Sequence, residues 1–411
     1  MHTRISYPLA VAIAAGALAV LGLAAPASAT APAPAVRPAR PVIAYVLDTP
    51  PCRGSTVNPI DTATNTALKP ITVGLGVNAI AVTPNGKTVY VSSGAGPGPG
   101  TVCSSLEPPA ASTVTPISTA TDKPGKPINA GKSPGAIAIT PNGKTAYVVN
   151  SGTGAAPGNT VTPIRTATNT AGKAIKVGSN PGAIAITPNG KTAYVVNDGS
   201  DTVTPIRTAT NTALKAIKVG SNPGAIAITP NGKTAYVVNG FSGTVTPIRT
   251  ATNSALKAIR FGMPTGMLVA SEKIAITPNG TTAYVTDTSN AANRVVPIRT
   301  ATNTALKAIK VETYPGAIAI TPNGKTAYIL IASGYVVPIN TATNTALKAI
   351  KVTGLLANIA ITPNGKTAYI LNAVFEPGTF PGTVIPLRIA TGTLGKPITV
   401  GSGPGLIVFA P

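Results

Sequence analysis

One sequence motif recurs along most of this chain and restricts the folds that are open to it. A clear copy is GAIAITPNGKTAYVVNDGSDTVTPIRTATNTALKAIKVG, from Gly182 to Gly220. Its Thr-Pro-Asn-Gly part occurs seven times, at spacings of 41 to 57 residues. Its tyrosine has eight copies: Tyr45, Tyr90, Tyr147, Tyr194, Tyr236, Tyr284, Tyr328 and Tyr369. One such unit cannot bury both of its apolar faces alone, so the copies must pack against one another.

Four strands are predicted within each copy. Ala183 to Thr187 is short, apolar and bounded by Gly and Pro, which is typical of a buried strand. A Pro-Asn-Gly turn follows, because Pro presets the first turn position and Gly accepts left-handed angles. Ala193 to Asn197 returns to complete a hairpin. Thr202 to Thr208 and Ala213 to Val219 are the third and fourth strands, and the lack of a 3.6-residue period predicts almost no helix.

Repeats of this length with four strands predict an all-β fold, the β-propeller, in which antiparallel blades pack around an axis. There are seven first-strand turns but eight second strands. The missing first strand lies at the C-terminal end, where Gly405 to Pro411 aligns with Gly182 to Pro188. We therefore predict eight blades, with seven as the alternative. The closing blade combines three N-terminal strands with the last residues, which removes two open sheet edges.

The motifs TPNGKTAYVVN and TVTPIRTATNT resemble the YVTN family of β-propeller repeats. That family has a Tyr-Val-Thr-Asn-like second strand after a Pro-Asp-Gly-Lys-like turn, and the resemblance extends from Pro41 to Pro411. Two departures matter. This chain has Asn where the family usually has Asp in the turn, and Pro-Ile-Arg where it usually has Val-Ile-Asp in the third strand. Both departures remove acids.

The N-terminal residues are predicted to direct export. Residues 1 to 29 have an apolar stretch from Pro8 to Leu23 and a small-residue cleavage site at Ala29, which indicate a signal peptide. A membrane anchor is the alternative, but the apolar stretch is short for a span and lacks a basic stop-transfer flank. Residues 30 to 41 are an Ala/Pro-rich, disordered leader, and residues 42 to 411 are the single propeller domain.

The two cysteines, Cys52 and Cys103, fall in second-to-third-strand loops of neighbouring blades. In an exported chain this arrangement predicts a disulfide that joins the closing blade to the next one. Two free thiols are the alternative.

Packing must rely on small apolar residues, because the chain has no Trp and only 4% aromatic residues. The recurring tyrosines are therefore predicted to be interblade contacts, with an aromatic cage as the alternative. Each third strand also carries a proline, from Pro59 to Pro386. An interior strand needs the N–H that proline lacks, so we expect a bulge or an unpaired position at each one.

The net charge is +22, from 32 bases and 10 acids, and it is unevenly placed. Most acids lie in or beside the loops of one face, the top, which holds the second-to-third and fourth-to-first connections. The opposite face, the bottom, is predicted to carry a basic ring: Lys87, Lys144, Lys191, Lys233, Lys325, Lys366, Arg207, Arg249 and Arg299. This ring predicts attraction to an anionic polymer. Solvated turn lysines and protection of outer strand edges are the alternative.

A second, polar ring is predicted at the top, where the second strands end. Its members are Asp48, Asn150, Asn197, Asn239, Asp287 and Asn372, together with Ser93, while the remaining copy has Ile331. Asn and Asp could cap the strand ends, or they could surround an upper funnel that binds a glycan or a peptide. The variable loops lie on the same face, which is therefore the expected recognition face.

Several kinds of chemistry are excluded. The only histidine is His2, which signal cleavage removes, so histidine-based catalytic and metal sites are absent from the mature chain. No Cys-x-x-Cys-His haem motif and no Gly-x-Gly-x-x-Gly motif opening a helix is present. Asn197 to Asp201 could offer oxygens to Ca²⁺, but Ca²⁺ sites usually carry more carboxylates. We expect no metal and no cofactor.

These features predict a secreted or cell-wall-associated, monomeric, non-enzymatic binding scaffold without a transmembrane span. Its expected partner is a protein or an anionic cell-envelope polymer. Specific nucleic-acid binding is not expected, because no aromatic residues interleave with the bases. Two alternatives remain: a lactonase-like hydrolase that uses acids of the top funnel, and a structural component of a surface layer.

Overall fold

The structure is a computed structural model that describes residues 41–49, 54–94, 112–153, 156–261, 273–288, 293–312, 314–373 and 382–410. The predicted signal peptide, nearly all of the leader, and both Cys52 and Cys103 lie outside these ranges, so their roles stay predictions. Within the ranges the one helical element is a 3-10 turn, η1 (Asp198–Ser200). No helix there has the length and apolarity needed to cross a bilayer.

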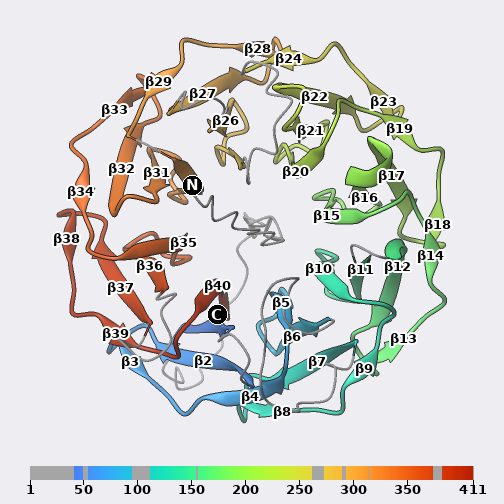
Figure 1. The fold of residues 1–411 in the computed structure, drawn as a ribbon, viewed down its shortest axis with the longest axis horizontal. Helices are drawn as coiled ribbons and strands as arrows, with labels where there is room; N and C mark the ends of the chain where they lie inside the picture. The colour runs from blue at the N-terminus through green and yellow to red at the C-terminus, as the bar shows by residue number, and fades with distance from the viewer. Residues whose placement is uncertain are drawn as a thin grey trace, which may run out of the picture.

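Eight antiparallel sheets surround a central axis, as Figure 1 shows, and they are named here blades A to H in chain order. The innermost strands of blades A to H are β40 (Pro404–Ala410), β5 (Val77–Val82), β10 (Pro134–Ile139), β15 (Pro181–Ile186), β20 (Pro223–Ile228), β25 (Ile274–Ile276), β30 (Pro315–Ile320) and β35 (Leu355–Ile361). The second strands are β1 (Ile43–Asp48), β6 (Thr88–Ser93), β11 (Thr145–Thr153), β16 (Thr192–Asn197), β21 (Thr234–Asn239), β26 (Thr282–Asp287), β31 (Thr326–Ile331) and β36 (Thr367–Ala373).

The third strands are β2 (Ser55–Asp61), β7 (Thr113–Ser118), β12 (Ala156–Arg165), β17 (Thr202–Arg207), β22 (Thr244–Arg249), β27 (Arg294–Arg299), β32 (Tyr335–Asn340) and β37 (Thr383–Arg388). Each fourth strand consists of two short pieces. The first pieces are β3 (Thr66–Ala67), β8 (Lys123–Pro124), β13 (Thr170–Ala171), β18 (Thr212–Ala213), β23 (Ser254–Ala255), β28 (Thr304–Ala305), β33 (Thr345–Ala346) and β38 (Thr393–Leu394). The second pieces are β4 (Ile71–Gly74), β9 (Ile128–Asn129), β14 (Ile175–Lys176), β19 (Ile217–Lys218), β24 (Ile259–Arg260), β29 (Ile309–Lys310), β34 (Ile350–Lys351) and β39 (Ile398–Thr399).

The predicted ring closure and blade number are confirmed. Strand β40 pairs antiparallel with β1, with Tyr45 opposite Val408, so the last residues supply the innermost strand of blade A. The seven-blade alternative is wrong, because the structure has eight sheets. Closure leaves β40 and β1 with hydrogen-bonded partners where two open edges would otherwise invite association with other chains.

The break in each fourth strand explains how a proline fits an interior strand. In blade D, Ile206 pairs with Ala213 and Val203 pairs with Ile217, so three residues of the fourth strand face two of the third. The carbonyl of Pro205 accepts a hydrogen bond from the N–H of Leu214 inside this bulge. The proline nitrogen, which has no hydrogen to donate, therefore faces the part of the fourth strand where the ladder is already interrupted. The expected bulge is confirmed.

The core is divided among the interfaces between blades. Eight clusters of buried apolar residues occur, and each joins side chains of two neighbouring blades. Between blades D and E, for example, Tyr194 and Val203 pack with Ala235 and Val237. Small Val, Ile and Ala side chains let the sheets approach closely. Because no blade buries its faces alone, stability depends on the whole ring.

Candidate functional site

The bottom face is built from two kinds of turn that are bonded to each other. In blade D the Thr187 hydroxyl donates to Asn189 Oδ1 over 2.7 Å, and the same oxygen accepts the Lys191 N–H over 3.0 Å. Gly190 has φ of 69°, a left-handed angle that glycine adopts without a Cβ penalty. Thr208, after the third strand, donates its hydroxyl to the Gly190 carbonyl over 2.5 Å. The backbone that carries each bottom lysine is thus fixed on both sides.

The tyrosines extend this bonding from one blade to the next. Tyr194 is fully buried, and its hydroxyl donates over 2.6 Å to Asn253 Oδ1 in the third-to-fourth-strand turn of blade E. Seven of the eight tyrosines donate in this way, to Asp122, Asn169, Asn211, Asn253, Asn303, Asn344 and Asn65. All seven acceptors have positive φ between 51° and 56°. Their bonding supports interblade packing, not an aromatic cage.

Every member of the predicted basic ring is exposed on this bonded face. The turn lysines are Lys87, Lys144, Lys191, Lys233, Lys325 and Lys366, and the strand-end arginines are Arg207, Arg249 and Arg299. Among the described residues none of the nine forms an ion pair with an acid. No neighbouring acid therefore neutralises these charges, and the side chains extend into solvent from turns that are held by hydrogen bonds.

The ring is not symmetric around the axis. Blades C, D, E and H carry both a turn lysine and a strand-end arginine. At the strand-end position, blade A has Asp61 and blade B has Ser118. Blade B also has Asp122, which accepts the Tyr45 hydroxyl. Burial, together with this carboxylate, raises the pKa of Tyr45 well above its usual value. The bottom is therefore most basic away from blades A and B.

A hollow of about 1050 Å³ opens on the basic part of the bottom. It is lined by turns of blades E, F and G, with one cation from each: Lys233, Arg299 and Lys325. Blade F has Thr281 where the other turns have lysine, and its hydroxyl folds back onto Asn279 Oδ1 over 2.9 Å. The short threonine leaves room that a lysine side chain would occupy. We call this concavity the bottom hollow. It was not predicted from the sequence, although the sequence has Thr281 where the other turns have lysine.

The predicted polar ring at the top lies below the surface, except that Asn372 is only partly buried. Asn197 and Asn239 have no exposed area, and Asn150 is 1% exposed. In blade D the Asn197 amide donates to Thr202 Oγ1 and Thr204 Oγ1 of the neighbouring strand, over 3.1 and 2.9 Å. Gly178 sits against this side chain, because a Cβ there would lie 2.7 Å from Asn197 Cγ. These are the contacts of strand-end caps. A binding role for the ring stays a prediction that requires these groups to become accessible.

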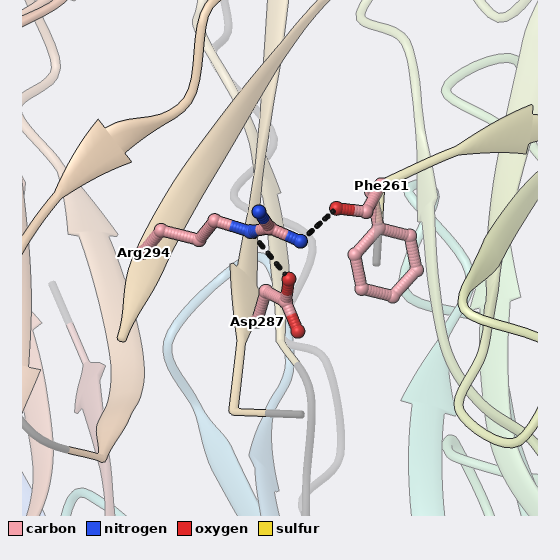
Figure 2. A network of polar contacts seen from close by, with 3 residues as sticks. All are labelled: Phe261, Asp287 and Arg294. Carbon is pink, nitrogen blue, oxygen red and sulfur yellow. Dashed lines mark hydrogen bonds and ion pairs between the residues drawn. The ribbon is translucent and has the colours of Figure 1, made fainter. Parts of the chain in front are cut away.

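Two members of the ring are acids, and each has its own partner. Asp48, in blade A, accepts the Gly403 N–H over 2.6 Å, and burial raises its pKa above the usual value. Asp287, in blade F, is fully buried and pairs with Arg294 at 2.7 Å. Figure 2 shows that Arg294 also reaches the Phe261 carbonyl, over 3.2 Å. Blade F thus has an ion pair where blades D and E have an Asn–Thr pair.

The acidic loop considered for Ca²⁺ also has partners within the protein. Both carboxylate oxygens of Asp198 accept amide N–H groups, from Asn222 over 2.7 Å and Asn180 over 3.1 Å. Asp201 accepts the Asn222 N–H over 2.9 Å. Burial raises the pKa of Asp198 above its usual value. These bonds join connections on both sides of blade D, and no group of three metal-ligating side chains occurs among the described residues.

One half-buried cation was not anticipated from the sequence. Lys273 directly precedes β25, at the position of Ala183 in blade D, and burial lowers the pKa of its amine to about 8. Its backbone N–H donates to Thr286 Oγ1 over 2.9 Å. Residues 262–272, which lead into it, lie outside the described ranges.

The blades, their closure and the repeated turns define the chain as a β-propeller repeat protein. A family model described as Lactonase, 7-bladed beta-propeller matches residues 178–334, which is less than half of the chain. Its description gives seven blades, whereas this chain has eight. A search of curated proteins finds no match.

Solved structures with the same kind of fold share little sequence with this chain. Dihydro-heme d1 dehydrogenase NirN in complex with DHE has a TM-score of 0.71 and 13% identity, covering 91% of this chain and 78% of that one. Citrobacter koseri AztD has a TM-score of 0.62 and 13% identity, covering 90% and 97%. Kuenenia stuttgartiensis hydrazine synthase has a TM-score of 0.53 and 21% identity, covering 78% and 94%. At these identities the likeness concerns the fold alone.

Proposed function

We propose that this protein is a secreted, non-enzymatic binding scaffold whose basic bottom face docks on an anionic cell-envelope polymer. The observation that carries the proposal is the set of nine exposed cations without acidic partners among the described residues. Three more features support it: the bottom hollow, the fixed turns that hold the lysines, and the net charge of +22. We also propose that the repeats are of the YVTN type and that the mature protein is a monomer.

The electrostatic reasoning is direct. Bringing several fixed cations close to a polyanion releases condensed counterions, which makes binding favourable and dependent on salt. The backbone that carries these lysines and arginines needs no rearrangement, because the turns are bonded to each other and to the next blade. Specificity is expected to be modest, since exposed lysines act as point charges.

The test uses five lysines that can be exchanged for a residue the chain itself accepts. Lys144, Lys191, Lys233, Lys325 and Lys366 would be changed to Thr, which blade F has at the equivalent position, Thr281. Affinity for an isolated anionic wall polymer is expected to fall about tenfold or more at low salt. The matched control changes the same five lysines to Arg, which keeps the charge and should bind within about twofold. Equal affinity of the Thr variant and the parent would overturn the proposal.

A second candidate function, a lactonase-like hydrolase, is favoured by the family-model match over residues 178–334. Its catalytic acids would have to come from the top, where Asp48, Asp198 and Asp287 are engaged in the contacts described above. A panel of lactones, assayed with and without divalent metal ions, separates the two functions. Turnover that is lost on changing Asp198 to Asn would favour the hydrolase, whereas the scaffold predicts none.

A further inference from the structure

The outer wall of the propeller carries a second set of cations that the bottom ring does not include. In blade D the fourth strand has Lys215 inside the bulge and Lys218 three residues later, and both are exposed while Ile217 between them is buried. Three residues of strand span about 10 Å. A Lys at the first position occurs in all eight blades, at Lys69, Lys126, Lys173, Lys215, Lys257, Lys307, Lys348 and Lys396.

The second cation is restricted to five consecutive blades. Blades C to G have a base there, at Lys176, Lys218, Arg260, Lys310 and Lys351, and all five are exposed. Blades H, A and B have Thr399, Thr72 and Asn129 instead. The ten cations of blades C to G are called here the wall belt.

The wall belt is continuous because neighbouring fourth strands meet. The second piece of one fourth strand contacts the first piece of the next, as β14 does with β18, β19 with β23, β24 with β28 and β29 with β33. These pieces lie around the circumference in Figure 1. Between blades F and G a groove of about 460 Å³ runs beside Lys307 and Lys310 and is bounded by the turn from Thr343 to Ala346. Among the described residues of these strands no acid interrupts the belt.

Protection of sheet edges is the simplest rival explanation. Lysine and proline on an outer strand discourage pairing with other chains, and the three blades without a second cation have Pro70, Pro127 or Pro397 next to their first lysine. Edge protection does not, however, explain why blades C, D and E are basic on both the wall and the bottom, although blade H, which lacks the second wall cation, also has both bottom cations. Blades A and B have Asp61 and Asp122 at the bottom and lack the second wall cation as well.

We propose that the wall belt is a track on which a flexible, acyclic phosphodiester polymer lies as it extends from the bottom face. This inference rests on the proposed function and names the class of polymer and its route. The fourth-strand pieces of blades C to G contain no aromatic residue, so these pieces offer neither sugar rings nor bases a stacking surface. Nine of the ten cations are lysines, which suit the point-like charges of phosphodiesters better than a rigid, bidentate array.

The test compares two sets of five substitutions that remove equal charge. The wall variant changes Lys176, Lys218, Arg260, Lys310 and Lys351 to Thr, the residue that blades A and H have there. The bottom variant is the Lys→Thr set described above. Affinity for poly(glycerol phosphate) is measured by fluorescence anisotropy at one low salt concentration. Both variants are expected to lose about tenfold, and the combined variant more.

Each result separates the wall belt from the bottom ring. If the wall variant binds within about twofold of the parent while the bottom variant loses affinity, the belt is overturned and the proposed function stands. If only the wall variant loses affinity, the belt stands and the bottom is not the docking face. If neither loses affinity, both are overturned. If single-stranded poly(dT) of equal length binds more tightly through the belt, the choice of a non-nucleic polymer is wrong.

The edge-protection explanation is tested in the same preparation. Light scattering of the wall variant shows whether the exchanged edges cause association. Association with unchanged affinity would assign the second cations to edge protection and overturn the belt. Should the Thr set fail to remain soluble, a Gln set at the same five positions keeps longer polar side chains on the edge. It is expected to lose affinity to the same degree.

Discussion

At the scale of single residues, the bond between a tyrosine and the next blade repeats around nearly the whole ring. Seven tyrosine hydroxyls donate to an acceptor in the following blade, while Tyr328 has no such bond among the described residues. The reason is local, because blade H has Gly392 where the other turns have Asn or Asp. The sequence predicted that the tyrosines pack, but it could not assign their acceptors from one repeat. Six acceptors lie 59 to 79 residues further along the chain, and the seventh, Asn65, lies 304 residues before Tyr369.

Changing Gly392 to Asn is expected to restore the missing bond. Gly392 has φ of 67°, near the angles of the seven acceptors, and an added Cβ would meet only Ile350 Cδ1, at 3.8 Å. The free energy of unfolding should rise by about 1 kcal/mol, measured by urea denaturation. In a Tyr328→Phe background most of this gain should vanish. An unchanged or lower stability of the single variant would contradict the assignment.

The same tyrosines predict a loss of stability at alkaline pH. Burial raises the pKa to about 12 for Tyr90, Tyr147, Tyr194, Tyr236, Tyr284 and Tyr369. The unfolded value is about 10. Because the folded state holds these protons longer, their contribution is complete below pH 10 and is lost as the pH rises towards 12. Tyrosinate absorbance should therefore appear together with unfolding. Ionisation near pH 10 with the fold intact would show that the phenols are accessible.

At the scale of the element, each blade follows one pattern with a few exchanged pairs. Where the second strand of a blade meets the third at the top, blades D and E have an Asn–Thr pair and blade F has the Asp287–Arg294 pair. The strands and turns could be predicted because they rest on local patterns of Pro, Asn and Gly. The interrupted fourth strand was predicted only as a continuous strand, since its bulge depends on the proline of the strand beside it.

The Asp287–Arg294 pair predicts that the stability lost in one variant can be regained by a second substitution. Changing Arg294 to Thr leaves the fully buried Asp287 carboxylate without its cation, which should cost roughly 2 kcal/mol. The cost is below that of breaking a fully buried pair, because Arg294 itself is partly exposed. Adding Asp287→Asn recreates the pair found in blade D, so the double variant should regain most of the lost stability. Thermal unfolding of the two single variants and the double variant gives the coupling free energy between residues 287 and 294. A double variant as unstable as the sum of both singles would argue against an interchangeable pair.

At the scale of the whole molecule, ring closure could be predicted from counting. Seven first-strand turns and eight tyrosines required the C-terminal residues to complete blade A, as they do. The candidate site could be predicted only in part. The basic ring follows from the position of each lysine after a turn, whereas the bottom hollow depends on how the turns of blades E, F and G meet. The burial of Asn197 and Asn239 depends on packing against the fourth-to-first connections, which sequence alone does not fix.

The measurement that tests the central claim most directly is the salt dependence of binding to the anionic polymer. The parent and the five-lysine Thr variant would be titrated across a series of salt concentrations, and the logarithm of the affinity plotted against that of the salt. We predict a steep linear fall for the parent and a slope shallower by up to about one for each lysine removed that contacts the polymer. Equal slopes for parent and variant, or binding that does not respond to salt, would contradict docking through the basic bottom face.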